Sequence, residues 1–285
     1  MKPATLQFAD HRVSRRGFVQ SLTALGISTV GMPAIVRATG VGEGLPSVGR
    51  LAEDSGTYVF SHLTTHPRKT EAFVAMMEGL HPLTRKHGGW ILHGAYLQIT
   101  DHTGPHTAVI DVWEVPDADT SSDLAGMGQD PAMAQVSPLL QESFAGETLQ
   151  VMRKLPVKIP SWDETAGSSP TYMFAHVTLK PGTVDTFTDM LGDMAPIFYK
   201  HRGWKLRGSY LPLGPLGDRS PAVGAMEGLT DTATAIWEVP DINAIVTNLK
   251  SSLEDPAYQK LEPAMRECVA GEVQQVMTKL PVKLT

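Results

Sequence analysis

One feature limits the possible folds of this chain more than any other: much of the sequence occurs twice. The stretch KHGGWILHGAY begins at Lys86 and KHRGWKLRGSY begins at Lys200, and seven of their eleven positions are identical. Other segments recur in the same order, namely TYVFSHLT with TYMFAHVT, WEVPD with itself, and QVMRKLPVK with QVMTKLPVK. A repeat of this length indicates one structural unit built twice, so the fold must have two similar halves.

Each copy predicts the same order of strands and helices. The first strand covers residues 58–64 in copy one, where aromatic and β-branched residues dominate. The next helix carries apolar residues at helical spacing, which in copy two are Phe187, Met190, Leu191, Met194, Ile197 and Phe198. Two strands at 90–100 and 107–115, a second helix and a strand at 147–155 complete copy one. This order is typical of the ferredoxin-like unit, an antiparallel sheet with both helices on one face.

A single unit of this kind leaves one face of its sheet uncovered. Two units in one chain can cover these faces for each other, so we expect an α+β fold in which two tandem ferredoxin-like βαββαβ units pack sheet to sheet. The first unit is expected at residues 57–158 and the second at 171–285. Between them, residues 159–170 form a polar linker that contains Pro, Gly and Ser.

The first 38 residues differ in character from the rest. SRRGFVQ contains the pair Arg15 and Arg16, with Phe18 two positions later, and an apolar stretch then runs to a small-residue site, VRA. This order resembles a twin-arginine signal peptide at residues 1–38, followed by a lead-in at 39–56. We therefore expect the folded protein to be exported to the periplasm by the twin-arginine translocase and the signal to be cleaved.

The charge of the chain excludes several classes of partner. Residues 1–38 carry +4 of a total net charge of −6, so the remainder carries −10. This argues against nucleic acid or an anionic membrane as the main partner. No later segment approaches the ~20 apolar residues of a membrane-spanning helix, so stable membrane insertion after cleavage is not expected. The single cysteine, Cys268, excludes an internal disulfide.

Several motifs resemble those of a known family. TLKPG begins at Thr178, KHGGW and KHRGW mark helix ends, and WEVPD precedes a helix that contains DPA. Together these resemble the NIPSNAP-like family of the dimeric α/β-barrel superfamily, twice over, across essentially the whole mature chain. The resemblance implies an intramolecular dimeric α/β barrel, but the family has no single agreed reaction. Its first strand commonly carries polar residues on the face that Ser61 and Ala175 occupy here.

Two histidines are the candidate catalytic residues. His62 and His176 stand near the ends of the two first strands, in phase with Tyr58 and Tyr172. Strand alternation then predicts that they face the helices or a pocket mouth. Each could act as a base, or as a metal or haem ligand, or could be a buried histidine with a structural hydrogen bond.

Aromatic and charged residues supply the candidate ligand-binding positions. The aromatic residues on neighbouring strands could line a pocket for a flat molecule or could be packing residues. Glu114 and Glu238 point to the face opposite the preceding Trp residues and could pair with a base across the pseudo-two-fold axis. That base would be His93 or Arg207. The full set is Tyr58, Tyr172, Tyr96, Tyr210, Trp113, Trp237, His93, Arg207, Glu114 and Glu238.

These observations predict an exported protein that binds a small aromatic or apolar molecule in a pocket between sheet and helices. Superfamily resemblance implies that it could be a cofactor-independent oxygenase. The alternatives are a non-enzymatic binding or interaction protein, or a haem or metal protein that uses His62 and His176. The sequence names no cofactor and no specific metal site. A tandem chain already pairs its units, so we expect a monomer or a low-order homo-oligomer.

Overall fold

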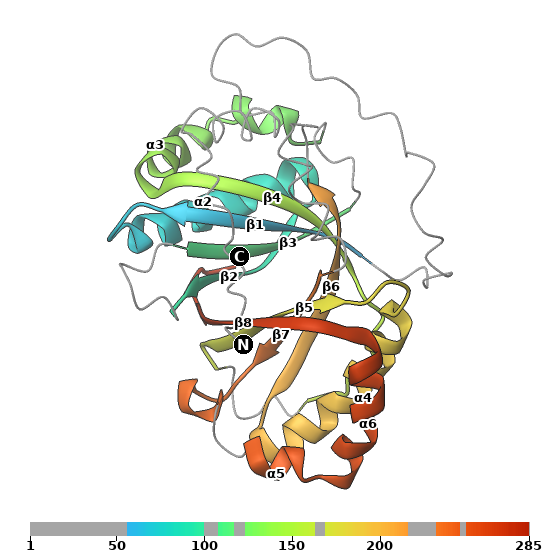
Figure 1. Ribbon diagram of the computed structural model, residues 1–285. Helices are drawn as coiled ribbons and strands as arrows, with labels where there is room; N and C mark the ends of the chain where they lie inside the picture. The colour runs from blue at the N-terminus through green and yellow to red at the C-terminus, as the bar shows by residue number, and fades with distance from the viewer. Residues whose placement is uncertain are drawn as a thin grey trace.

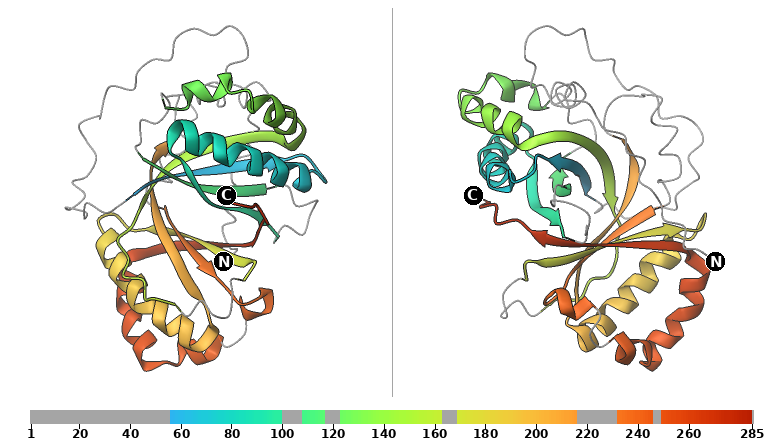
Figure 2. Two further views of the ribbon diagram at one scale, coloured as in Figure 1. Left: turned by 180° about the vertical axis from the view of Figure 1, so that it is seen from behind. Right: turned by 60° about the vertical axis from the view of Figure 1, so that its left-hand side comes forward.

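The computed structural model describes residues 56–99, 108–116, 123–162, 169–215, 232–245 and 249–284. A barrel of strands forms the centre of the molecule, and the helices of each half cover its outer surface on opposite sides (Figures 1 and 2). The expected export signal, with Arg15, Arg16 and Phe18, lies outside the described residues. In the part of the chain that is described, no helix is long and apolar enough to cross a membrane.

Both halves have the predicted order of elements. The first unit consists of β1 (Thr57–Thr65), α2 (Thr70–Gly88), β2 (Ile91–Gln98), β3 (Ala108–Val115), η1 (Asp123–Gln129), α3 (Met133–Ser143) and β4 (Phe144–Lys154). The second consists of β5 (Thr171–Leu179), α4 (Val184–Arg202), β6 (Lys205–Pro215), β7 (Thr232–Glu238), η3 (Ile242–Ile245), α5 (Leu249–Leu253), α6 (Pro256–Cys268) and β8 (Val269–Lys279). The βαββαβ prediction is confirmed for each half.

The two sheets close into one eight-stranded barrel. Its strand order is β1-β3-β2-β8-β5-β7-β6-β4, and neighbouring strands are antiparallel. The halves meet at two joints, where β2 pairs with β8 and β4 pairs with β6. The inner faces of the sheets therefore cover each other, as predicted, and their edges are also joined.

Each strand has two buried faces, because one faces the barrel interior and the other faces the helices. The interior holds a cluster of aromatic and aliphatic side chains: Tyr58, Phe60, Tyr96, Ile110, Val112, Met152, Tyr172, Phe174, Tyr210, Ile236 and Met277. Two separate apolar clusters lie between the sheets and the helices of their own units. The barrel is thus a packed core rather than an open channel.

The phrase that occurs twice in the sequence is a structural element in both units. Gly89 and Gly203 follow α2 and α4 in the left-handed region, at φ of 68° and 67°, and end both helices. Gly94 and Gly208 lie beneath the rings of Tyr96 and Tyr210. A Cβ at either glycine would be only 2.7 Å from the tyrosine oxygen. The glycines therefore allow each tyrosine to fold back over its own strand into the barrel.

The Lys-His pairs at the helix ends bind the aspartate of the DPA motif. In the second unit, Lys200 and His201 approach Asp255 at 2.9 and 2.6 Å, and Asp255 caps α6 through the amide of Ala257. The first unit repeats this arrangement at Asp130. Hydrogen bonds from His201 and Lys200 hold the pKa of Asp255 well below its usual range. In both copies this contact connects the end of the first helix with the start of the second, α2 with α3 and α4 with α6.

Candidate functional site

The two candidate catalytic histidines lie inside the barrel. The alternative that they face the helices is wrong, because they share the strand face of Phe60 and Phe174, which belong to the interior cluster. His62 contacts Gln150 at 3.3 Å, and His176 contacts Gln275 and Thr234, each at 3.0 Å. Burial, and then the charge of His176, lowers the pKa of His62 to about 4. The histidines are therefore neutral side chains of the barrel interior at pH 7.

The predicted carboxylates meet their bases at one end of the barrel, within each unit. Glu114 Oε2 lies 2.7 Å from His93 Nε2 and accepts a hydrogen bond from the Tyr58 hydroxyl at 3.3 Å. Glu238 is bound by Arg207 at 2.6 Å and by Tyr172 at 3.2 Å. The expected pairing across the pseudo-two-fold axis is therefore wrong. Burial, followed by the charge of Glu114, raises the pKa of Tyr58 to about 12, so this tyrosine stays protonated.

The remaining predicted aromatics separate onto the two faces of the strands. Tyr96 and Tyr210 enter the barrel, where their rings lie 4.9 and 5.0 Å from Tyr172 and Tyr58. Trp113 and Trp237 lie on the helix-covered faces instead. These residues do not line one common pocket.

Two carboxyl groups, one buried and one partly exposed, lie on the helix-covered face of the first unit. Asp111 on β3 is opposite Ser61 on β1, and only 3% of each residue is exposed. The Ser61 hydroxyl donates to Glu147 Oε1 on β4 at 2.8 Å. Val59, Leu63, Val109 and Trp113 surround this group on the same strand faces. Two acids and a hydroxyl thus lie in an otherwise apolar layer, where Asp111 and Ser61 are buried and Glu147 is partly exposed.

This environment favours the protonated form of both acids. Burial, followed by the charge of Glu147, raises the pKa of Asp111 well above its usual value. Burial raises the pKa of Glu147 to about 7, although the hydrogen bond from Ser61 opposes this. Near neutral pH, Asp111 keeps its proton while Glu147 can gain or lose one. A carboxyl group with a pKa near the working pH is suited to general acid–base chemistry.

The second unit has no such group. The residues equivalent to Ser61 and Asp111 are Ala175 and Ala235, which are buried in the apolar cluster of their own unit. Glu272 occupies the position of Glu147, but it is exposed. The fold therefore does not require an acid at these positions. A buried carboxyl group is costly to keep, so its presence in only one unit points to a function.

Sequence reasoning missed Asp111, Glu147 and a third residue, His81, whose counterpart is Ala195. His81 is buried in α2, and its ring lies 6.3 Å from that of Trp113. The signal was present in the repeat, because aligned copies place a polar residue opposite Ala at both Asp111 and His81.

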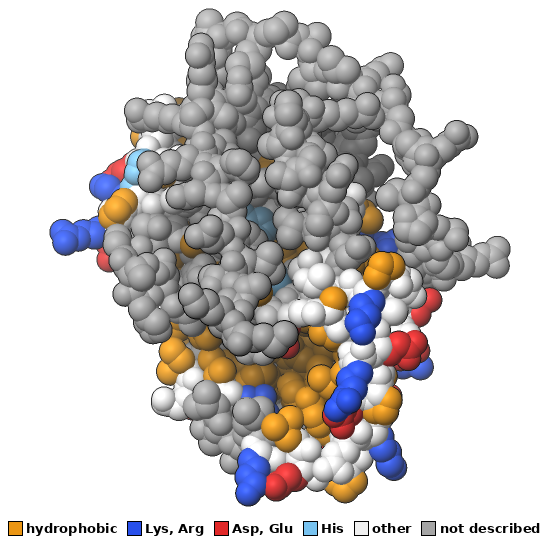
Figure 3. All heavy atoms as spheres, viewed as in Figure 1, with side chains coloured by type: hydrophobic (Ala, Val, Ile, Leu, Met, Phe, Trp, Pro, Cys, Tyr) orange, Lys and Arg blue, Asp and Glu red, His pale blue; other side chains and the backbone are white. Residues whose placement is uncertain are grey.

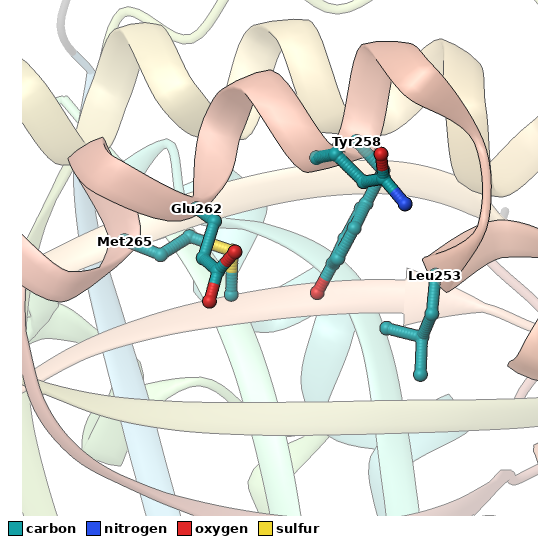
Figure 4. Close-up of a pocket in the computed structure, with 5 residues that line it drawn as sticks. Leu253, Tyr258, Glu262 and Met265 are labelled. Atoms are coloured by element: carbon teal, nitrogen blue, oxygen red, sulfur yellow. The ribbon is translucent and has the colours of Figure 1, made fainter.

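A groove in the second unit is a separate candidate for ligand binding. It has a volume of about 500 Å³ and is lined by Leu253, Tyr258, Gln259, Glu262 and Met265. Tyr258, Glu262 and Met265 point from one side of α6 (Figure 4). Hydrophobic side chains also gather around a hollow in this half of the molecule (Figure 3).

The groove exists because α6 is less covered than its counterpart α3. In the first unit, Met133, Val136 and Leu140 of α3 are buried. The equivalent residues of α6 are only partly buried, and Gln274 on β8 is exposed where the first unit has the buried Leu149. The helix-covered layer is thus more tightly packed in the first unit and more open in the second.

The described residues contain no group of three or more His, Cys, Asp or Glu side chains that could hold a metal ion. His62 and His176 have glutamine and threonine as their nearest polar partners.

Comparison with known proteins identifies the fold. No protein-family model matches the sequence, and no curated protein matches it. Among solved structures, an anthrone oxidase-like protein superposes with a TM-score of 0.52 at 14% identity, covering 80% of this chain and 92% of that chain. A putative monooxygenase from Lactobacillus acidophilus superposes with a TM-score of 0.51 at 11% identity, covering 79% and 94%. The protein is a dimeric α/β barrel.

At these identities the likeness concerns the fold alone. In this dimeric α/β barrel, both halves of the barrel come from one chain. The family resemblance and the export signal remain expectations from the sequence.

Proposed function

We propose that the protein is a small-molecule enzyme that removes a proton from its substrate on the helix-covered face of the first unit. The observation that carries this proposal is the pair of a buried Asp111 and a partly exposed Glu147, which the second unit replaces with Ala235 and an exposed Glu272. Glu147 is the base, because its pKa lies near neutrality and its side chain is partly exposed. Asp111 keeps its own proton and so adds no second negative charge.

Ser61 connects the two acids in this mechanism. Its hydroxyl donates to Glu147 Oε1 at 2.8 Å and also forms a hydrogen bond with Asp111. When Glu147 takes the proton of a substrate C–H bond, the electron pair stays on the substrate. Apolar side chains limit the access of water to Asp111 and Ser61, which strengthens the electrostatic effect of a charge on Glu147.

The proposed reaction class is cofactor-independent oxygenation of a small aromatic molecule. The carbanion left by proton removal is electron-rich and can react with dioxygen. In the balanced reaction, one activated methylene group and one molecule of dioxygen give one carbonyl group and one molecule of water. The carbon loses four electrons, and dioxygen gains them. Two solved proteins of this fold are described as anthrone oxidase-like and as a putative monooxygenase, which supports testing this chemistry first.

Oxygen consumption with anthrone as the probe tests the proposal. We expect the wild-type chain to consume dioxygen, and Glu147→Gln to lower the rate by at least about a hundredfold, as expected for loss of a general base. Glu272→Gln is the matched control in the second unit and should keep the wild-type rate. Equal rates in Glu147→Gln and wild type would refute the assignment of Glu147.

The second candidate function is non-enzymatic binding of an apolar molecule in the groove of about 500 Å³ on α6. Binding of a fluorescent apolar probe, such as 1-anilinonaphthalene-8-sulfonate, should then fall in Tyr258→Ala. The equivalent change in the first unit, Met133→Ala, removes a buried side chain and serves as the control. If anthrone is not turned over and Tyr258→Ala alone loses probe binding, this second function is favoured.

We also propose export to the periplasm by the twin-arginine route. The support is the sequence order of Arg15, Arg16 and Phe18, followed by an apolar stretch and a small-residue site. Replacing both arginines with lysine should retain the full-length precursor in the cytoplasm. Unchanged export of this variant would contradict the proposal.

A further inference from the structure

Unpaired polar atoms are concentrated in the helix-covered layer of the first unit. Among the described residues, seven buried side-chain nitrogen and oxygen atoms have no hydrogen-bond partner. Four of them belong to this layer: Nδ1 and Nε2 of His81, Nε1 of Trp90 and Oδ1 of Asp111. Only 3% of each of these three residues is exposed. A buried polar group without a partner costs about 1–3 kcal/mol, so a set of four requires an explanation.

The four atoms belong to residues that surround one indole ring. The Trp113 ring lies 6.3 Å from the ring of His81 and 6.1 Å from that of Trp90. The Trp113 side chain also forms a hydrogen bond with Asp111. His81, Trp90 and Asp111 therefore lie around the same aromatic side chain, on the strand face that also carries the acid pair.

The second unit packs without these groups. Ala195 and Ala235 replace His81 and Asp111, and both alanines are buried. Trp204 replaces Trp90, but the guanidinium carbon of Arg202 lies 3.6 Å from the centroid of its ring, where the first unit has Gly88. The repeat thus provides an internal comparison: the same fold forms with and without the unpaired atoms of His81 and Asp111.

The donors in this layer suit an oxygen atom. Trp90 Nε1 can only donate a hydrogen bond, and a neutral imidazole donates from one nitrogen and accepts at the other. Burial and the charge of Arg85 lower the pKa of His81, which favours the neutral ring. A carbonyl or phenolic oxygen would accept from these donors, while the indole rings would contact the flat apolar part of the molecule.

We infer that Trp90 and His81 bind an oxygen atom of the ligand, and that the ligand is a flat conjugated molecule in which that oxygen lies across the ring system from its reacting C–H bond. This rests on the proposed function, because it uses Glu147 of the same layer as the base. As the proton moves to Glu147, negative charge develops on the ligand oxygen. Donors fixed at that oxygen stabilise the charge.

Two probes with the same carbon skeleton test the inference, namely acetophenone, which has a carbonyl oxygen, and ethylbenzene, which lacks it. Calorimetric titration of the full chain should show that acetophenone binds at least about tenfold more tightly, the range of one buried hydrogen bond. Trp90→Phe keeps an aromatic ring but removes the N–H, and should abolish this preference. His81→Ala, which introduces the residue of the second unit, should reduce it.

Trp204→Phe is the matched control and should leave the preference unchanged. Three results would overturn the inference: no preference in wild type, no binding of either compound, or the same loss in Trp204→Phe as in Trp90→Phe. In each case, water would be the better partner for the buried atoms. Thermal unfolding of every variant shows whether a loss of binding reflects a loss of the fold.

The failure of this inference can be told apart from the failure of the proposed function. Glu147→Gln should keep the preference for acetophenone, since it removes the base and leaves Trp90 and His81 in place. A preference that depends on Trp90, together with full turnover in Glu147→Gln, would refute the base and leave the oxygen site standing. Loss of turnover in Glu147→Gln, without any preference for acetophenone in wild type, would refute the oxygen site and support Glu147 as the base.

Discussion

The ionisation of Glu147 should lower the stability of the protein as the pH rises, and Glu147→Gln should remove this pH dependence. Burial raises the pKa of Glu147 from 4.5 to about 7 in the folded chain. Folding therefore favours the protonated acid. Its contribution to stability is present below pH 4.5 and is lost as the pH rises through 7. Glu147→Gln keeps an oxygen that can accept from Ser61 but cannot ionise, so this loss should disappear.

The magnitude follows from the size of the shift. A difference of about 2.5 pKa units corresponds to about 3 kcal/mol, which is an upper limit because Glu147 is partly exposed. With these values, the ionisation of Glu147 costs about 1 kcal/mol at pH 5 and about 3 kcal/mol at pH 8. The glutamine variant should therefore gain about 2 kcal/mol more at pH 8 than at pH 5.

Urea unfolding of both proteins at pH 5 and pH 8 measures this difference. Comparing the two proteins at each pH cancels the effects of all other titrating groups. Glu272→Gln is the control, because Glu272 is exposed on β8 and its charge remains in water. The reasoning is refuted if Glu147→Gln changes stability equally at both pH values, or if Glu272→Gln shows the same pH-dependent gain.

Three further predictions concern the barrel and its helices. Folding lowers the pKa of His62, so its contribution to stability is present above pH 6.5 and is lost as the pH falls towards 4. In His62→Gln, the melting temperature should therefore fall less between pH 7 and pH 5 than in wild type. Parallel curves of melting temperature against pH for the two proteins would contradict this. Gly94→Ala should lower the free energy of unfolding by about 1–3 kcal/mol, because its Cβ would meet the Tyr96 hydroxyl. Gly271→Ala is the control: no atom lies within 4 Å of its Cβ, so it tests whether any added methyl group has this effect. Asp255→Ala removes the cap of α6 and the contacts with Lys200 and His201, so it should melt at a lower temperature than the exposed control Glu254→Ala; equal melting of the two would exclude a stabilising role for this contact.

The architecture could be predicted because its signals are local and occur twice. Apolar spacing indicated the helices, and the glycine after each Lys-His pair indicated the helix end, which the left-handed Gly89 and Gly203 confirm. One ferredoxin-like unit has an uncovered sheet face, so the repeat itself predicted that the two sheets cover each other.

The faces of the strands could not be assigned in the same way. Strand alternation places Tyr58, Phe60 and His62 together and Val59, Ser61 and Leu63 together, but it does not say which set faces the helices. In a closed barrel covered by helices, both sets are buried. The sequence therefore offers no polar face as a guide, so strand alternation alone does not place His62 inside the barrel.

The proximity of Asp111 and Glu147 could not be predicted from the sequence for a related reason. Asp111 stands alone in an apolar strand, and Glu147 comes from a strand more than thirty residues later. Only strand pairing in the folded chain places both beside Ser61. A comparison of the copies, position by position, would still have found Asp111 opposite Ala235.

The joints between β2 and β8 and between β4 and β6 lie within a single polypeptide. The halves cannot separate on dilution or exchange with other copies, so closure of the barrel does not depend on protein concentration. In an assembly of identical subunits, any substitution appears in every subunit. Covalent linkage removes this constraint, so one half can accumulate residues that weaken the fold while the other keeps the barrel stable.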